Sequence, residues 1–114
     1  MARSVLARLD DIDLTISGIE AALDGVSFDM FSQSWTLQRA VERGLEIISE
    51  ASRALPPELK AIAPDLPWAD IAGIGNVLRH EYQRIEPLII WNIVEYRFHE
   101  LKAAMNQIRA MPDL

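Results

Sequence analysis

The chain has 114 residues, of which 50% are hydrophobic and 25% are charged, a composition sufficient for one buried core. Its net charge of -6 argues against a broad electrostatic grip on nucleic acid, although a small local basic site stays compatible with it. Without cysteine, disulfides, thiolate zinc sites and cysteine nucleophiles are excluded, and no residue cluster suggests a metal or a cofactor. No targeting segment or bilayer-spanning run is apparent, so we expect a cytoplasmic protein without a membrane association.

Apolar residues recur at every third or fourth position in the first segment and predict an amphipathic helix. The series is Leu6, Leu9, Ile12, Ile16, Ile19 and Leu23. Asp24-Gly25 ends the helix, because Gly25 can adopt the left-handed C-cap conformation. We expect Asp10, Asp11 and Asp13 on a solvated face, which could also meet a basic partner.

Ser27 or Asp29 is expected to cap a second helix that carries Trp35 and continues to Leu55, with an apolar seam from Leu37 onward. Pro56-Pro57 ends this helix, and the stretch 56–63 is compatible with one more helical turn.

A third helix is predicted from Pro67 to Tyr82. Gly73 and Gly75 each weaken it by roughly 1 kcal/mol relative to alanine, and close packing of another helix is the simplest reason for them. A fourth helix is predicted from about Pro87 to Met111, with an apolar arc wide enough for two neighbours, one of which could be a second copy of the chain. The expected fold is all-α, an up-and-down bundle of four to five helices forming one domain over residues 1–114.

The third helix also carries a recognisable pattern. In chain order its members are Pro67-Trp68, Ile71-Ala72-Gly73, Asn76, His80 and Tyr82. Together with the stretches 41–51 and 91–94, this pattern resembles HepT-like proteins of the HEPN superfamily, the toxin half of HepT–MntA toxin–antitoxin pairs. The resemblance spans roughly the whole chain and implies a HEPN-like helical bundle.

The resemblance implies a homodimeric, metal-independent endoribonuclease that acts on RNA. His80 would be the general acid/base, since an imidazole near neutral pKa can accept the 2′-hydroxyl proton or protonate the 5′-oxygen. Asn76 lies four residues earlier on the same helical face and would support His80. Tyr82 would be the residue that an MntA-like nucleotidyltransferase antitoxin adenylylates to neutralise the toxin.

One departure from the family pattern concerns the motif Arg-x4–6-His. The positions five to seven residues before His80 hold Gly75, Ile74 and Gly73, so the arginine is absent, which leaves open both an active enzyme and one whose activity is weak or lost. Arg79 is a candidate phosphate contact, but it lies about 100° round the helix from His80. In a homodimer, Arg79 or Arg84 of the second copy could approach His80 instead.

Two other functions remain open. The chain could be a non-catalytic HEPN binding module that pairs with a nucleotidyltransferase, which the absent arginine and the acidic charge favour. It could also be a purely structural helical dimer. Without the family pattern, a histidine at a helix end would more often be a cap or a surface residue. Asn76 would more often be a surface or interhelical hydrogen-bonding residue, and Tyr82 a partly buried packing residue. His99 is expected to be structural or solvated, and Trp35, Trp91 and Phe98 to lie in the core or a dimer contact.

Overall fold

The computed structural model describes residues 4–81 and 86–112, without the side chains of residues 79–81. Within this part of the chain there are six helices and no strand, so the all-α prediction is confirmed. They are α1 (Val5–Leu23), α2 (Phe28–Ser32), α3 (Trp35–Arg53), α4 (Pro57–Lys60), α5 (Trp68–Glu81) and α6 (Pro87–Arg109). None of the described helices is long and apolar enough to cross a membrane.

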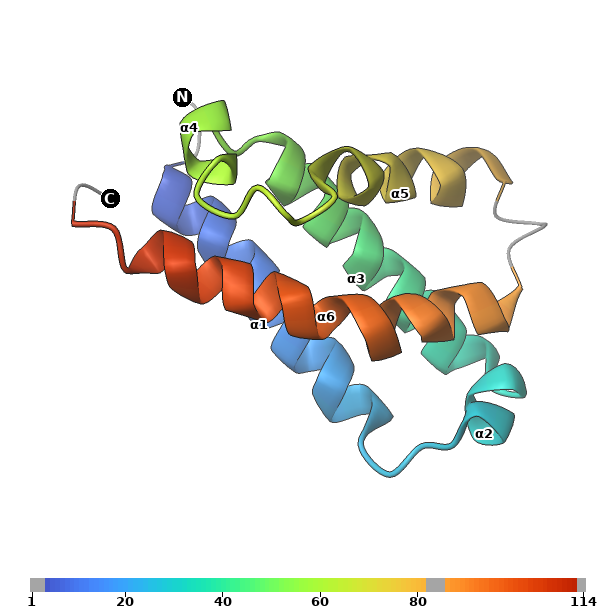
Figure 1. The fold of residues 1–114 in the computed structure, drawn as a ribbon. Coiled ribbons are helices and arrows are strands. Elements are labelled where there is room, and N and C mark those ends of the chain that lie inside the picture. The colour runs from blue at the N-terminus through green and yellow to red at the C-terminus, as the bar shows by residue number, and fades with distance from the viewer. Residues whose placement is uncertain (1–3, 82–85, 113–114) are drawn as a thin grey trace.

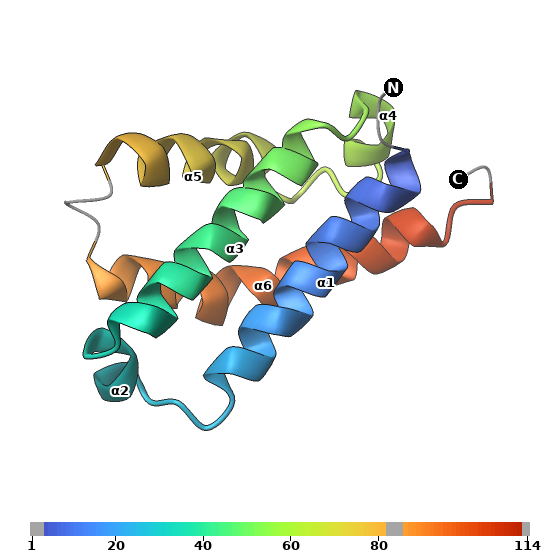
Figure 2. The same cartoon turned by 180° about the vertical axis from the view of Figure 1, so that it is seen from behind.

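Helix α3 is the centre of the bundle. It packs antiparallel to α1 on one side and against α5 on the other, while α6 lies over one face of the α1–α3 pair (Figure 1 and Figure 2). The start of α1, the short α4 and the end of α6 gather at one end of the molecule, and α2 lies at the opposite end. The predicted turn after Pro56 is α4, and Gly25 has the expected positive φ of 73°.

The core follows the predicted apolar seams. Its most deeply buried side chains include Leu9, Ile12 and Ile16 of α1, Val41 and Leu45 of α3, and Met105 and Ile108 of α6. Burial of each such side chain contributes about 1.5–3 kcal/mol relative to leaving it exposed. The prediction was wrong for Leu6, which is 49% exposed in the first turn of α1, where its neighbour Val5 packs against the core instead.

Trp35 is also not a core residue. As the first residue of α3 it is 69% exposed, and the Arg39 guanidinium lies 5.6 Å from its ring centroid. Phe98 is buried, as predicted, and the half-buried Trp91 of α6 contacts Phe31 of α2, with ring centroids 5.3 Å apart.

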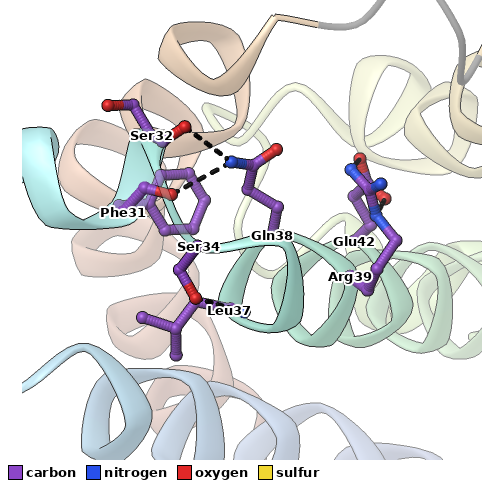
Figure 3. A network of polar contacts seen from close by, with 7 residues as sticks. All are labelled: Phe31, Ser32, Ser34, Leu37, Gln38, Arg39 and Glu42. Atoms are coloured by element: carbon purple, nitrogen blue, oxygen red, sulfur yellow. Dashed lines mark hydrogen bonds and ion pairs between the residues drawn. The ribbon is translucent and has the colours of Figure 1, made fainter.

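The second predicted helix is divided into α2 and α3 by a short joint (Figure 3). Ser27 caps α2, as expected, but Ser34 caps α3 by accepting the Leu37 N–H at 3.1 Å. The Gln38 side-chain amide then donates to the carbonyls of Phe31 and Ser32 at 3.1 and 3.0 Å. The Gln38 amide thus gives the Ser32 carbonyl a donor and adds a second donor to the Phe31 carbonyl, which also accepts the Ser34 N–H at 3.1 Å.

A close contact between two helices occurs at Gly44, a glycine for which the sequence predicted no role. A Cβ atom on Gly44 of α3 would lie 2.5 Å from Ile19 Cδ1 and 3.2 Å from Thr15 Cγ2 of α1. By contrast, a Cβ on Gly73 of α5 would meet no atom within 4 Å. Close packing within one chain therefore explains Gly44 and does not explain Gly73, contrary to the expectation.

The acidic face of α1 meets α6 of the same chain. Arg109 donates to Asp10 and Asp13 at 2.8 Å each, and Lys102 contacts Glu20 at 3.1 Å. The hydrogen bond that Arg109 donates to Asp10 is the main cause that raises the pKa of Arg109; the contacts with Asp13 raise it further, and partial desolvation lowers it. Asp10 and Asp13, which were expected on a solvated face, are therefore ion-paired with α6.

Candidate functional site on helix α5

The start of α5 is fastened to the preceding loop by a tryptophan. Trp68 donates its indole N–H to the carbonyls of Lys60 at 3.1 Å and Ala63 at 3.0 Å. Buried indole nitrogens need such acceptors, and the two bonds anchor the first turn of α5 on α4 and the loop after it. The Pro67-Trp68 part of the sequence pattern thus sets the position of α5.

The middle of α5 is joined to α3 by polar contacts. The Ser49 hydroxyl donates to the Ala72 carbonyl at 2.7 Å and accepts the Gly75 N–H at 3.1 Å. Arg53, one turn further along α3, donates its Nη2 to the same Ala72 carbonyl at 2.6 Å. Gly75 is buried at this junction, so position 75 faces α3.

Around this junction, α5 has one buried side and one exposed side. Ile71 and Leu78 are buried in the core, whereas Asn76 and Val77 are exposed. His80 belongs to α5 and lies four residues after Asn76, about one helical turn along the same face. The helix therefore brings these two predicted site residues to one face.

The remaining predicted positions are outside what the structure describes. Tyr82 and Arg84 fall in the segment that is not described. Arg79 lies within α5, but only its backbone is described. Their proposed roles stay predictions.

An apolar groove of about 360 Å³ lies between α5 and α6. Gly73, Ile74 and Val77 line it from α5, and Ile89 and Ile93 line it from α6. Val77 and Ile89 are 48% and 52% exposed, so solvent reaches large aliphatic side chains on both walls of the groove. Asp70 is the charged residue among the described lining residues, so the groove suits an apolar occupant rather than RNA.

His99 lies apart from this region. It is exposed on α6 and borders a hollow formed with the loop after α4, lined by Pro64, Asp65 and Gln107 among others. The described residues hold no group of three or more histidine, aspartate or glutamate side chains that could bind a metal ion.

Sequence reasoning missed Ser49 and Arg53. Their signal is a pair of polar residues four apart on α3, hence on one helical face, beside the apolar seam that includes Leu45 and Ile48. Such a pair predicts a polar contact with a neighbouring helix, but the sequence does not tell which helix that is.

Comparison with known proteins gives a consistent result over most of the chain. The family model described as "Ribonuclease HepT-like" matches residues 12–108. "Probable ribonuclease HepT" of Thermococcus cleftensis is 33% identical over 109 residues, covering 96% of this chain and 99% of the relative. A "Putative RNase" of Caldanaerobacter subterraneus is 38% identical over 84 residues, covering 74% of this chain and 75% of the relative.

A "Putative RNase" of Methanocaldococcus jannaschii is 31% identical over 100 residues, which is 88% of this chain and 92% of the relative. No solved structure matches the chain significantly. The match of the family model, the near full-length relatives and the all-α bundle agree: the chain belongs to the HepT-like ribonuclease family.

Proposed function

We propose that the protein is a metal-independent endoribonuclease whose site lies on the face of α5 that carries Asn76 and His80. Membership of the HepT-like ribonuclease family over residues 12–108 is the observation that carries the proposal. The register of α5 supports it, because Asn76 is exposed and His80 follows one turn later on the same face.

The proposed chemistry needs a base, an acid and a charge-stabilising group. The 2′-hydroxyl loses its proton and attacks the adjacent phosphorus, the bond to the 5′-oxygen breaks, and that oxygen receives a proton. His80 serves as the general acid/base, because an imidazole near its ordinary pKa exchanges protons readily at neutral pH. Asn76 orients the imidazole or binds a phosphate oxygen through its amide. The products are a 2′,3′-cyclic phosphate and a 5′-hydroxyl.

The proposed active form is a homodimer that brings two copies of α5 to a shared cleft. The groove between α5 and α6 supports this arrangement, since Gly73, Val77 and Ile89 leave apolar surface that no part of the described chain covers. Apolar surface of this kind is typical of interaction sites.

We further propose that an MntA-like nucleotidyltransferase antitoxin neutralises the protein. The Tyr82 phenol oxygen would attack the α-phosphorus of ATP, releasing pyrophosphate and a proton and leaving an adenylyl group on the tyrosine. The added negative charge, two residues from His80, would repel RNA.

The alternative is a non-catalytic binding module that keeps the nucleotidyltransferase partner. It is favoured by Gly75, which occupies the arginine position of the family motif, and by the net charge of -6. Loss of one charge-stabilising donor costs about 2.7–4 kcal/mol of barrier, enough to abolish useful activity.

The test uses single-stranded RNA and the same sequence with 2′-O-methyl groups, each incubated with purified protein in excess chelator. We expect cleavage of the RNA alone, with 2′,3′-cyclic phosphate ends, because the nucleophile is the free 2′-hydroxyl. Intact RNA after long incubation would contradict catalysis and leave the binding module as the function.

A further inference from the structure

The guanidinium of Arg53 lies against the turn of α5 from which a motif arginine would extend. Its Nη2 is 2.6 Å from the Ala72 carbonyl oxygen. Helix carbonyls point toward the C-terminal end, so this oxygen lies near the level of Gly75, the position that holds no side chain. Position 75 of α5 carries no cationic side chain, but the guanidinium of Arg53 from α3 lies beside it.

The guanidinium also lies on the side of α5 that carries the proposed site. Ala72, Asn76 and His80 are four residues apart in turn, and each such step advances only about 40° beyond a full helical turn. Arg53 thus lies at one end of a row that continues through the exposed Asn76 to position 80.

Arg53 differs from most other described cations because it forms no ion pair with a carboxylate of the described residues. Five cations of the described part pair with carboxylates, namely Arg39, Arg43, Arg97, Lys102 and Arg109. Arg53 has no such ion pair within the described residues, and it is exposed. Its contact with Ala72 uses one of the five N–H donors of a guanidinium, which leaves donors for an anion.

The contact with Ala72 also limits the freedom of the side chain. Arginine loses rotamer entropy when it is immobilised, so a side chain already held at its tip binds an anion at a lower entropic cost. Ser49 holds the same turn of α5 in place, because its hydroxyl donates to the Ala72 carbonyl at 2.7 Å and accepts the Gly75 N–H at 3.1 Å.

We propose that Arg53 is the phosphate-binding residue of the ribonuclease site, replacing the arginine that the family motif places at position 75. The proposal rests on the proposed function, since it assigns the charge-stabilising group of that same site. A planar guanidinium matches two phosphate oxygens at once and stabilises the charge that develops on them as the 2′-oxygen attacks. A local cation of this kind is compatible with the net charge of -6, which argues only against a broad electrostatic grip on RNA.

The experiment measures binding of a 2′-O-methyl RNA oligonucleotide, which cannot be cleaved, at several salt concentrations. The proteins are wild type, Arg53→Ala, Arg53→Lys and the matched control Arg43→Ala. Arg43 lies on the same helix with its side chain 66% exposed and 3.6 Å from Glu46. Circular dichroism and thermal unfolding establish the folded fraction of each protein.

We expect Arg53→Ala to weaken binding about tenfold or more and to reduce the slope of log K against log salt by about one charge. Arg53→Lys should keep the salt slope, because it keeps the charge, while binding more weakly for lack of the planar fork. Arg43→Ala should bind as wild type does. If Arg53→Ala binds with the affinity and salt slope of Arg43→Ala, the proposal is overturned, even if its melting temperature falls, because a structural role alone would lower only stability.

Cleavage of ordinary RNA by the same proteins separates this proposal from the function on which it rests. If wild type cuts RNA while Arg53→Ala cuts and binds equally well, the Arg53 proposal fails alone. If wild type cuts nothing but Arg53→Ala still loses affinity, catalysis fails and the phosphate contact stands. If wild type does not bind the oligonucleotide at all, both are overturned.

Discussion

Helix α3 contacts α1 on one side and α5 on the other, and the two contacts differ in kind. Toward α1 it presents Gly44, where a Cβ would come within 2.5 Å of Ile19, so the two helices pack closely there. Toward α5 it presents Ser49 and Arg53, which bind backbone groups of Ala72 and Gly75. The first contact stabilises the bundle, whereas the second holds the exposed Arg53 side chain beside α5 with the help of the buried Ser49 hydroxyl.

The polar contact predicts strong coupling between positions 53 and 75. Gly75→Arg should raise RNA cleavage only slightly in the wild-type background, where Arg53 already supplies the charge. In an Arg53→Ala background the same change should restore cleavage by roughly 10–100-fold, because it returns a charge-stabilising donor. Cleavage rates of the four proteins measure this coupling.

Position 75 is buried, and overpacking costs about 1–3 kcal/mol, so rates are compared at a temperature at which all four proteins are folded by circular dichroism. An equal gain from Gly75→Arg in both backgrounds would show that the two positions act independently.

The apolar contact predicts a loss of stability from Gly44→Ala. Overpacking against Ile19 and Thr15 should cost about 1–3 kcal/mol and outweigh the gain in helix propensity of about 1 kcal/mol. Urea unfolding measures the difference. The matched control is Gly18→Ala, in which the new Cβ meets no atom within 4 Å, so only the propensity gain remains. Equal stability of the two variants would contradict the close packing described for α1 and α3.

The open side of α5 predicts the opposite response to a larger residue. Gly73→Leu should leave the single-chain fold intact, since a Cβ there meets nothing within 4 Å, but it should fill the groove between α5 and α6. If that groove receives a second copy, self-association measured by sedimentation should weaken about tenfold. Unchanged association would place the dimer contact elsewhere or show that the chain acts alone.

The ion pairs between α1 and α6 predict the smallest effect. Arg109→Ala should cost at most about 1 kcal/mol, because the pairs are partly exposed and screened by water and salt. Because the pKa of Arg109 is raised in the fold, its contribution to stability is fully present below the ordinary guanidinium pKa and is lost only in strong alkali. The loss of stability caused by Arg109→Ala should therefore be constant from pH 6 to 9. Thermal unfolding at low and high salt checks this, and a cost that is unaffected by salt would be unexpected.

Periodic apolar spacing predicted the long helices and most of their buried residues, because burial of one face is a local property of the pattern. The joint at Ser34 was missed, since α2 is only five residues long and the apolar pattern runs on across it. The prediction that Gly73 allows close packing of another helix was wrong, because a Cβ at this position would meet no atom within 4 Å. A glycine signals close approach or open space equally well, and only the position of the neighbouring helices distinguishes Gly44 from Gly73.

The α5 face could be predicted from Asn76 and His80, because both lie on one helix with fixed spacing. The contribution of Arg53 could not, since it comes from a residue more than twenty positions before Asn76 and depends on how α3 crosses α5. Sites that combine residues from different elements are set by tertiary packing, which a single sequence does not specify.

The most direct measurement compares RNA cleavage in excess chelator by wild type, His80→Ala and His99→Ala. The two variants remove the two histidines of the chain, one on the α5 face and one on an exposed part of α6. We predict that His99→Ala cuts like wild type and that His80→Ala loses about 10²–10⁴-fold in rate, the usual contribution of a general acid or base. Equal cleavage by wild type and a folded His80→Ala would contradict the site on α5.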